Sequence, residues 1–160
     1  MIPIMSFRPE IYDKIIGQIK LIEYRRCFPK NCSMAYMYVS RSIKAICGII
    51  YFGNLHSLYD WQNEFREFSE VQRRINDYLE NENYRYGAEI SAIQKIKPIT
   101  LDELRKNVPN FAAPQSYMFV DNNQSLKQYI EKNIKHIGPL IKNDLTEIYP
   151  QHICQRYQLY

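Results

Sequence analysis

Glycine and histidine are scarce in this sequence, with 5 glycines and 3 histidines among 160 residues. So few glycines disfavour a glycine-rich phosphate-binding loop. The histidines, His56, His136 and His152, are scattered, and no Cys/His or Ser/His/Asp spacing typical of nucleophilic catalysis stands out. Long apolar runs are missing as well, since no stretch approaches the roughly 20 residues that span a membrane. These absences disfavour a P-loop enzyme, a triad hydrolase and a membrane partner.

Cysteine is also uncommon, and its four positions are Cys27, Cys32, Cys47 and Cys154. Their spacing matches no zinc-binding pattern. The segment from Met1 to Phe7 is too short for the apolar part of a secretory leader. We therefore expect a cytoplasmic protein with reduced, mostly structural thiols. The sequence predicts no metal site and no cofactor.

Aromatic residues, in contrast, make up 14% of the chain and include 14 tyrosines. Tyrosine buries a large ring and keeps a polar tip, so it suits cores with wet edges and sites that stack on flat ligands. The codon bias of an AT-rich genome explains the same number equally well. The hydrophobic share of 46% and the charged share of 24% are ordinary for a globular protein, and the length suits one domain.

Positive charge is concentrated in one stretch of the chain. The formal net charge is +4. Between residues 20 and 44, however, a single acid, Glu23, stands against six cations: Lys20, Arg25, Arg26, Lys30, Arg41 and Lys44. This basic strip carries more net charge than the whole chain, so the remainder is close to neutral. A basic strip on a neutral body is typical of phosphate recognition.

Six segments rich in β-branched, aromatic and small apolar residues predict strands: residues 1–7, 19–26, 34–39, 45–52, 84–96 and 116–120. Two of them, 34–39 and 45–52, are apolar on both faces, as expected of a closed or covered sheet. Gly48 predicts a bulge or a close backbone approach. Short helices inserted among such strands predict an α+β fold, a small mixed β-barrel rather than a doubly wound parallel sheet.

The apolar spacing predicts helices after Pro9 and between residues 57 and 81, with a capping box at Ser69 to open the second helix of that stretch. From Ser125 the pattern is helical again, and Gly138-Pro139 predicts a break before another helix over 140–148. We therefore divide the chain into a strand-rich body and a C-terminal helical extension packed on it, residues 1–121 and 122–160.

The first candidate cluster follows the first helix and contains Lys20, Glu23, Arg25 and Arg26. Side chains alternate along a strand, so Glu23 and Arg25 share one face. A lysine, a glutamate and an arginine held close together can pair internally and leave the arginine fork for a phosphate or a base edge. A solvated strip of salt bridges on an edge strand is the alternative.

Two further clusters combine hydroxyls, an amide and a cation: Tyr38, Ser40 and Arg41 at the end of one strand, and Gln115, Ser116 and Tyr117 after a proline. Loops at strand ends often hold ligands on a rigid scaffold. Glutamine and serine can read base edges, and tyrosine can stack on a base. An ordinary polar turn and a capped strand start are the alternatives.

Taken in order, four runs resemble the ASCH domain family: Ile15 to Arg26, Tyr36 to Ser40, Ala45 to Gly48, and Pro114 to Tyr117. The resemblance covers roughly residues 1–120 and is closest to longer bacterial and phage-type members, which carry a Trp-containing helical insertion like residues 58–81. It implies a PUA-like β-barrel with a cleft lined by Lys20, Glu23 and Arg25, with Ser40 nearby. It also implies an association with RNA or modified nucleosides.

Two positions depart from the family pattern. Gln18 replaces the usual glycine two places before the lysine, so the turn from helix to strand must form differently. Family members that hydrolyse acylated cytidine place a threonine nucleophile two residues before the arginine, where this chain has Glu23. The hydroxyl nucleophile is therefore missing, which counts against the same amidohydrolase mechanism.

Our first hypothesis is an RNA- or nucleoside-binding module with a basic cleft. Its ligand-binding residues are Arg25, Arg26 and Arg41 for phosphate, Gln115 and Ser116 for polar edges, and Tyr38 or Tyr117 for stacking, beside Ser40. The alternative is a ribonuclease or a nucleoside amidohydrolase, with Lys20 as electrophile or base and Glu23 as general base. A third possibility is a homo-oligomer formed through the C-terminal helices, although packing of their apolar face on the chain's own barrel is the interpretation we favour.

Overall fold

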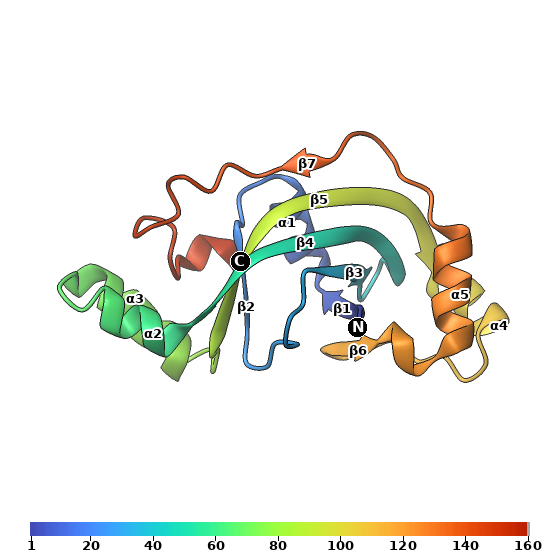
Figure 1. Ribbon diagram of the computed structural model, residues 1–160, viewed down its shortest axis with the longest axis horizontal. Coiled ribbons are helices and arrows are strands. Elements are labelled where there is room, and N and C mark those ends of the chain that lie inside the picture. The colour runs from blue at the N-terminus through green and yellow to red at the C-terminus, as the bar shows by residue number, and fades with distance from the viewer. Residues whose placement is uncertain (160) are drawn as a thin grey trace.

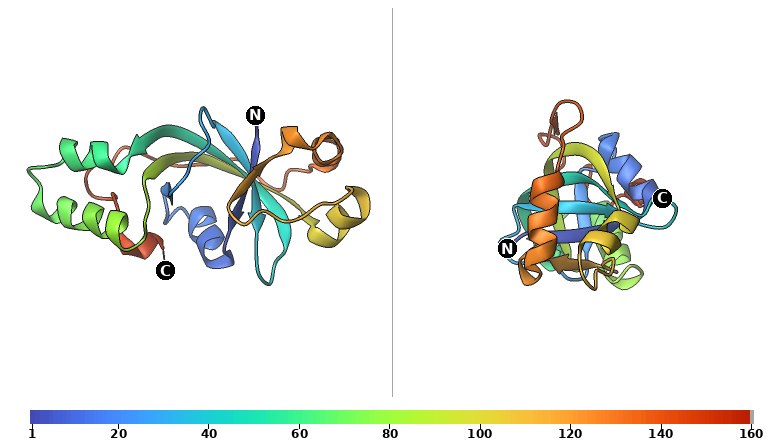
Figure 2. Two further views of the ribbon diagram at one scale, coloured as in Figure 1. Left: turned by 90° about the horizontal axis from the view of Figure 1, so that it is seen from below. Right: turned by 90° about the vertical axis from the view of Figure 1, so that its right-hand side faces the viewer.

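The computed structural model describes residues 1–159 as an α+β protein built on one mixed β-sheet (Figure 1). Seen end-on, the strands curl round as part of a barrel with helices about it (Figure 2). The predicted fold class is confirmed, and the inserted helices lie where the sequence pattern changes from the period of a strand to that of a helix.

Within the described residues the strand order is β2-β5-β4-β3-β1-β6, and β7 pairs with β5. β1 and β3 run parallel, whereas all other pairs are antiparallel. The strands are β1 (Pro3–Phe7), β2 (Ile22–Arg25), β3 (Met34–Val39), β4 (Ala45–Ser57), β5 (Tyr86–Thr100), β6 (Tyr117–Phe119) and β7 (Ile141–Lys142).

The two longest strands, β4 and β5, carry the curl of the sheet (Figure 1). Their pairing shifts register at Gly48 and again near Phe52, and such bulges bend a strand and increase its twist. A Cβ added at Gly48 would lie 3.3 Å from the backbone oxygen of Gln94. The bulge and the close approach predicted at this glycine are confirmed.

All α-helices of the described residues except α1 lie at the two ends of the sheet (Figure 1). α2 and α3 project together from one end, whereas α4 and α5 lie at the other (Figure 1). The helices are α1 (Pro9–Ile16), α2 (Leu58–Glu64), α3 (Ser69–Glu80), α4 (Leu101–Asn107) and α5 (Gln124–Asn133), with 3₁₀ turns at Val120–Asn122 and Arg156–Gln158.

Side-chain caps mark the start of three of these helices, and at α5 the side chain of Asn123 accepts a hydrogen bond from the backbone N–H of Leu126. Ser57 accepts a hydrogen bond from the backbone N–H of Tyr59 at the start of α2. Thr100 and Glu103 form a capping box on α4. The capping box predicted at Ser69 is wrong, because Ser69 is already helical and Phe68, the N-cap of α3, makes no side-chain cap bond.

Between residues 122 and 159 the chain contains one α-helix rather than two. Leu126 and Ile130 of α5 are wholly buried in a core cluster with residues of β4, β5 and α4, as we favoured for the apolar face of this segment. The helix predicted over 140–148 is wrong. There the chain is extended, and β7 hydrogen-bonds to the edge of β5, so sheet pairing satisfies backbone groups that a helix would otherwise have satisfied internally.

Gly138 adopts a φ of 69°, but in the connection between α5 and β7 rather than between two helices. The division of the chain at residue 121 stays a prediction. In residues 1–159 no helix has the length and apolar character needed to cross a membrane. The four cysteines are free thiols.

Candidate functional site

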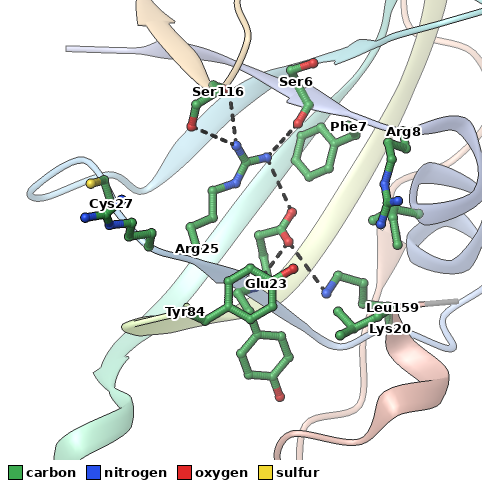
Figure 3. Close-up of a pocket in the computed structure, with 13 residues that line it drawn as sticks. Ser6, Phe7, Arg8, Lys20, Glu23, Arg25, Cys27, Tyr84, Ser116 and Leu159 are labelled. Carbon is green, nitrogen blue, oxygen red and sulfur yellow. Dashed lines mark hydrogen bonds and ion pairs between the residues drawn. The ribbon is translucent and has the colours of Figure 1, made fainter. Parts of the chain in front are cut away.

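Three charged side chains, from β2 and from the turn that precedes it, converge on one point (Figure 3). The Nζ of Lys20 lies 3.6 Å from Oε1 of Glu23, and Nη2 of Arg25 lies 3.6 Å from Oε2 of the same carboxylate. The carboxylate therefore stands between two cations. The convergence that we expected of Lys20, Glu23 and Arg25 is present in the structure.

The turn between α1 and β2 brings Lys20 to this point. Gln18 adopts a φ of 61°, the left-handed conformation that favours glycine. The backbone N–H of Lys20 donates to the carbonyl of Lys14, at the end of α1. The Gln18 amide in turn donates to the carbonyl of Lys142 and to Oδ1 of Asn143. A glutamine thus makes the turn for which the family uses glycine, with its side chain anchored on the C-terminal segment.

Arg25 is held from three sides. Its Nη2 donates to the carbonyl of Ser6 at 2.8 Å, and its Nη1 donates to the carbonyl of Ser116 at 3.1 Å. Its guanidinium carbon lies 5.0 Å from the centre of the Phe7 ring. These contacts join β2 to β1 and to the residue preceding β6. The guanidinium is therefore a fixed positive charge rather than a mobile surface group.

Burial strengthens the charge–charge interactions within the Lys20–Glu23–Arg25 group, because little water screens them. Lys20 is 1% exposed and Glu23 is 5% exposed. Burial lowers the pKa of Lys20, whereas the negative charge of Glu23 opposes that shift. Oε1 of Glu23 accepts a hydrogen bond from the backbone N–H of Tyr24, but Oε2 is buried and has no hydrogen-bond donor within residues 1–159. This oxygen is therefore a buried acceptor whose hydrogen-bonding capacity the chain leaves unused.

A cavity of about 440 Å³ lies over these groups. Four cations and one carboxylate line it, together with the rings of Phe7 and Tyr84 and the side chain of Leu159: Arg8, Lys20, Arg25 and Arg26 against Glu23. Its size falls in the range of ligand-binding clefts. A positive, partly aromatic cavity suits an anionic ligand that carries a flat ring.

Of the remaining predicted ligand-binding residues, one lines this cavity and the others do not. Ser116 lines it, whereas Tyr38, Ser40, Arg41 and Gln115 line a neighbouring cavity. Tyr117 lines neither of the two, because as the first residue of β6 it is half-buried beside the ring of Phe119. The single cleft expected from the sequence is thus two adjacent cavities.

Several residues of the two cavities were not predicted. Ser6 and Phe7 end β1, Arg8 follows them, and all three line the first cavity. A polar residue and a cation at a strand end were the available signal. Arg105 on α4 and Leu159 lie far away in the sequence, where nothing in the pattern pointed to the site. Only the folded chain places them there.

A second polar cluster was also missed, on the other face of the sheet. Nε2 of His56 lies 2.6 Å from Oε2 of Glu89, and the hydroxyl of Tyr149 donates to the same oxygen at 3.0 Å. The ring of Trp61 stacks on His56 with ring centres 4.8 Å apart. These residues come from β4, β5, α2 and the C-terminal segment, so no sequence spacing joins them.

No family model matches the chain. Its sequence is 28% identical over 131 residues to an ASCH domain-containing ribonuclease from Zymomonas mobilis subsp. mobilis, covering 78% of this chain and 87% of that protein. The crystal structure of ASCH from Zymomonas mobilis superposes with a TM-score of 0.64 at 23% identity, over 86% of this chain and 98% of that one. A single-residue variant of that protein gives a TM-score of 0.62 at 22% identity, over 84% and 99% of the two chains. At these identities the structural similarity bears on the fold.

Proposed function

Because the chain is an ASCH domain protein, we propose that it binds RNA and that one nucleotide of the RNA enters the cavity above Lys20, Glu23 and Arg25. The observation that carries the proposal is the convergence of these three side chains in a positively charged cavity of about 440 Å³. The name of the relative from Zymomonas mobilis, a ribonuclease, supports RNA as the ligand class.

Each part of the cavity has a role in this proposal. Arg8 and Arg26 stand at its rim, where they would pair with phosphate oxygens. The buried Oε2 of Glu23 would accept a hydrogen bond from an amino or hydroxyl group of the nucleotide. Phe7 and Tyr84 provide ring surface for stacking against the base. The fixed charge of Arg25 attracts the anion and holds the Glu23 carboxylate in place.

Binding of a labelled single-stranded RNA, followed by fluorescence anisotropy at low salt, tests the proposal. We expect Arg26→Gln to weaken binding on the order of tenfold, the scale of one charged hydrogen bond. Lys30→Gln is the matched control, since Lys30 belongs to the same basic strip, is exposed and lines neither cavity. The log of the affinity should fall with the log of the salt concentration by about 0.7 for each phosphate engaged. Equal affinities of the two variants would contradict the proposal.

RNA hydrolysis in the same cavity is a second candidate, favoured by one observation. Burial lowers the pKa of Lys20, which lies beside Glu23 in a cavity, and a lysine with a lowered pKa is a common general base. In this scheme the neutral form of Lys20 accepts the proton of the RNA 2′-hydroxyl as that oxygen bonds to the adjacent phosphorus, while the bond from phosphorus to the 5′-oxygen of the next nucleotide breaks and that oxygen takes a proton from water. Incubation of RNA with the wild-type protein, Lys20→Met and Glu23→Gln tests it: cleavage that survives both substitutions would exclude this mechanism, while binding can persist without cleavage.

The homo-oligomer through the C-terminal segment stays a prediction. Leu126 and Ile130, the most apolar positions of α5, are already buried within the chain, whereas Ile137 and Leu140 remain 46% and 42% exposed. Light scattering of the full chain after size-exclusion chromatography measures the mass directly. A monomeric mass at all protein concentrations would show that the predicted homo-oligomer does not form.

A further inference from the structure

The second cavity, of about 580 Å³, lies beside the first. Ser6 lines both cavities, and the consecutive residues Gln115 and Ser116 line the second and the first. The backbone N–H of Ser6 donates to the carbonyl of Ser116 at 2.8 Å. The backbone contact between β1 and the segment before β6 therefore lies at the border between the two cavities.

The charge of the second cavity is also positive. Arg41, Lys44 and Arg105 line it, against a single acid, Asp102. Arg41 lies 3.5 Å from the carboxylate of Glu10. Within residues 1–159, by contrast, neither Lys44 nor Arg105 forms an ion pair with an acid. Two cations that line a cavity without forming an ion pair favour an anionic ligand.

The turn that presents two of these cations is strained. Arg41 and Lys44 adopt φ angles of 58° and 52°, the left-handed region in which residues other than glycine are uncommon. The turn is nevertheless held on both sides, because Ser40 donates from its N–H and its hydroxyl to the carbonyl of Phe7, and Lys44 accepts from the N–H of Leu101. Backbone strain that the surroundings maintain is characteristic of ligand-binding sites.

A carboxylate stands between the cations of the two cavities. Glu10 lies 3.8 Å from Arg8, which lines the first cavity, and 3.5 Å from Arg41, which lines the second. All three side chains are at least 42% exposed. The pairs are therefore weak, and a phosphate can compete with Glu10 for both arginines.

From this arrangement we infer that the second cavity binds the phosphate adjacent to the nucleotide in the first. The ligand is then a single-stranded oligonucleotide of at least two nucleotides, with its backbone over Ser6 and Ser116. A free nucleoside or mononucleotide uses the first cavity only. The inference rests on the proposed function and adds to it the class of substrate.

The experiment compares a labelled RNA tetranucleotide with cytidine 5′-monophosphate on the full chain. Arg105→Gln should weaken binding of the tetranucleotide on the order of tenfold, as expected for one charged contact, and leave the mononucleotide affinity unchanged. For Arg105→Gln, the slope of the log of the tetranucleotide affinity against the log of the salt concentration should also be smaller in magnitude by about 0.7. Lys106→Gln is the matched control, since it removes the same charge from the next position of α4, which is exposed and lines neither cavity.

A variant that gains affinity guards against loss through misfolding. Glu10→Gln removes the competing carboxylate, so tetranucleotide binding should become about two- to fivefold tighter, the equivalent of a surface ion pair. Equal effects of Arg105→Gln and Lys106→Gln on the tetranucleotide would overturn the inference and leave the first cavity's role intact. Absence of any RNA binding by the wild-type chain would overturn both proposals. If inorganic pyrophosphate bound through Arg105 and the tetranucleotide did not bind, single-stranded RNA would be excluded as the ligand and the second cavity would be an anion site only.

Discussion

Two buried carboxylates on neighbouring strands have very different surroundings. Glu23 on β2 is 5% exposed, and Glu89 on β5 is 7% exposed. Glu23 lies between Lys20 and Arg25, at the floor of a cavity. Glu89 is covered by His56 and Tyr149, with Trp61 stacked over the histidine, and it lines neither cavity. Burial of an acid by itself therefore does not mark a binding site.

The partners of the two carboxylates explain the difference. Oε2 of Glu89 is satisfied by two hydrogen-bonding side chains, the ring of His56 and the hydroxyl of Tyr149, and burial and Glu89 itself raise the pKa of that hydroxyl. Oε2 of Glu23 has only the charge of Arg25 at 3.6 Å and no hydrogen-bond donor within the described residues. The first carboxylate is satisfied within the chain, whereas the second keeps one oxygen without a hydrogen bond.

The largest effect on stability is expected from Glu23→Ala. The substitution leaves the buried Lys20 and the partly buried Arg25 without a counter-ion, which should cost about 3–5 kcal/mol of the free energy of unfolding. Urea denaturation measures the loss. Adding Lys20→Met should recover part of it, because one uncompensated charge is then removed. If Glu23→Ala lowered the free energy of unfolding less than Glu89→Ala does, the proposed difference between the two carboxylates would be wrong.

Glu89→Ala should have a smaller effect, about 1–3 kcal/mol, because the partners left behind are polar groups rather than fixed charges. Tyr149→Phe removes one hydrogen bond to the same oxygen and should cost about 1 kcal/mol. A double-mutant cycle between the two positions isolates their coupling. Neither change should alter RNA affinity, and an RNA-binding defect in folded Tyr149→Phe would place this cluster in the functional site.

A further effect is a dependence of stability on pH near the Lys20–Glu23–Arg25 group. His152 accepts a hydrogen bond from the backbone N–H of Leu21, and burial, assisted by the charge of Lys20, lowers its pKa from 6.5 to about 4. The unfolded chain therefore binds the proton first, so this histidine makes stability fall as the pH drops from about 6.5 to about 4. In His152→Gln, the midpoint of urea denaturation should change less with pH between about 6.5 and about 4. An unchanged pH profile would exclude His152 as its source.

Local patterns were sufficient to predict the body of the protein. The strand segments, the bulge at Gly48 and the shared face of Glu23 and Arg25 follow from period-two alternation and from residue size, which are short-range properties. The tail was predicted less well. Its apolar residues fit a helix over 140–148, but the free edge of β5 offered backbone partners that no local pattern reveals.

The sequence by itself determined the α+β class and the placing of Lys20, Glu23 and Arg25 within six residues of one another, because neighbours in a chain stay neighbours in the fold. Only the tertiary structure decided that Ser6 and Ser116 bind Arg25, that Arg105 completes a second cavity and that the C-terminal segment closes the first with Leu159. These contacts join residues far apart in sequence, and they form because the curled sheet must bury its apolar surface against distant elements and satisfy its backbone groups.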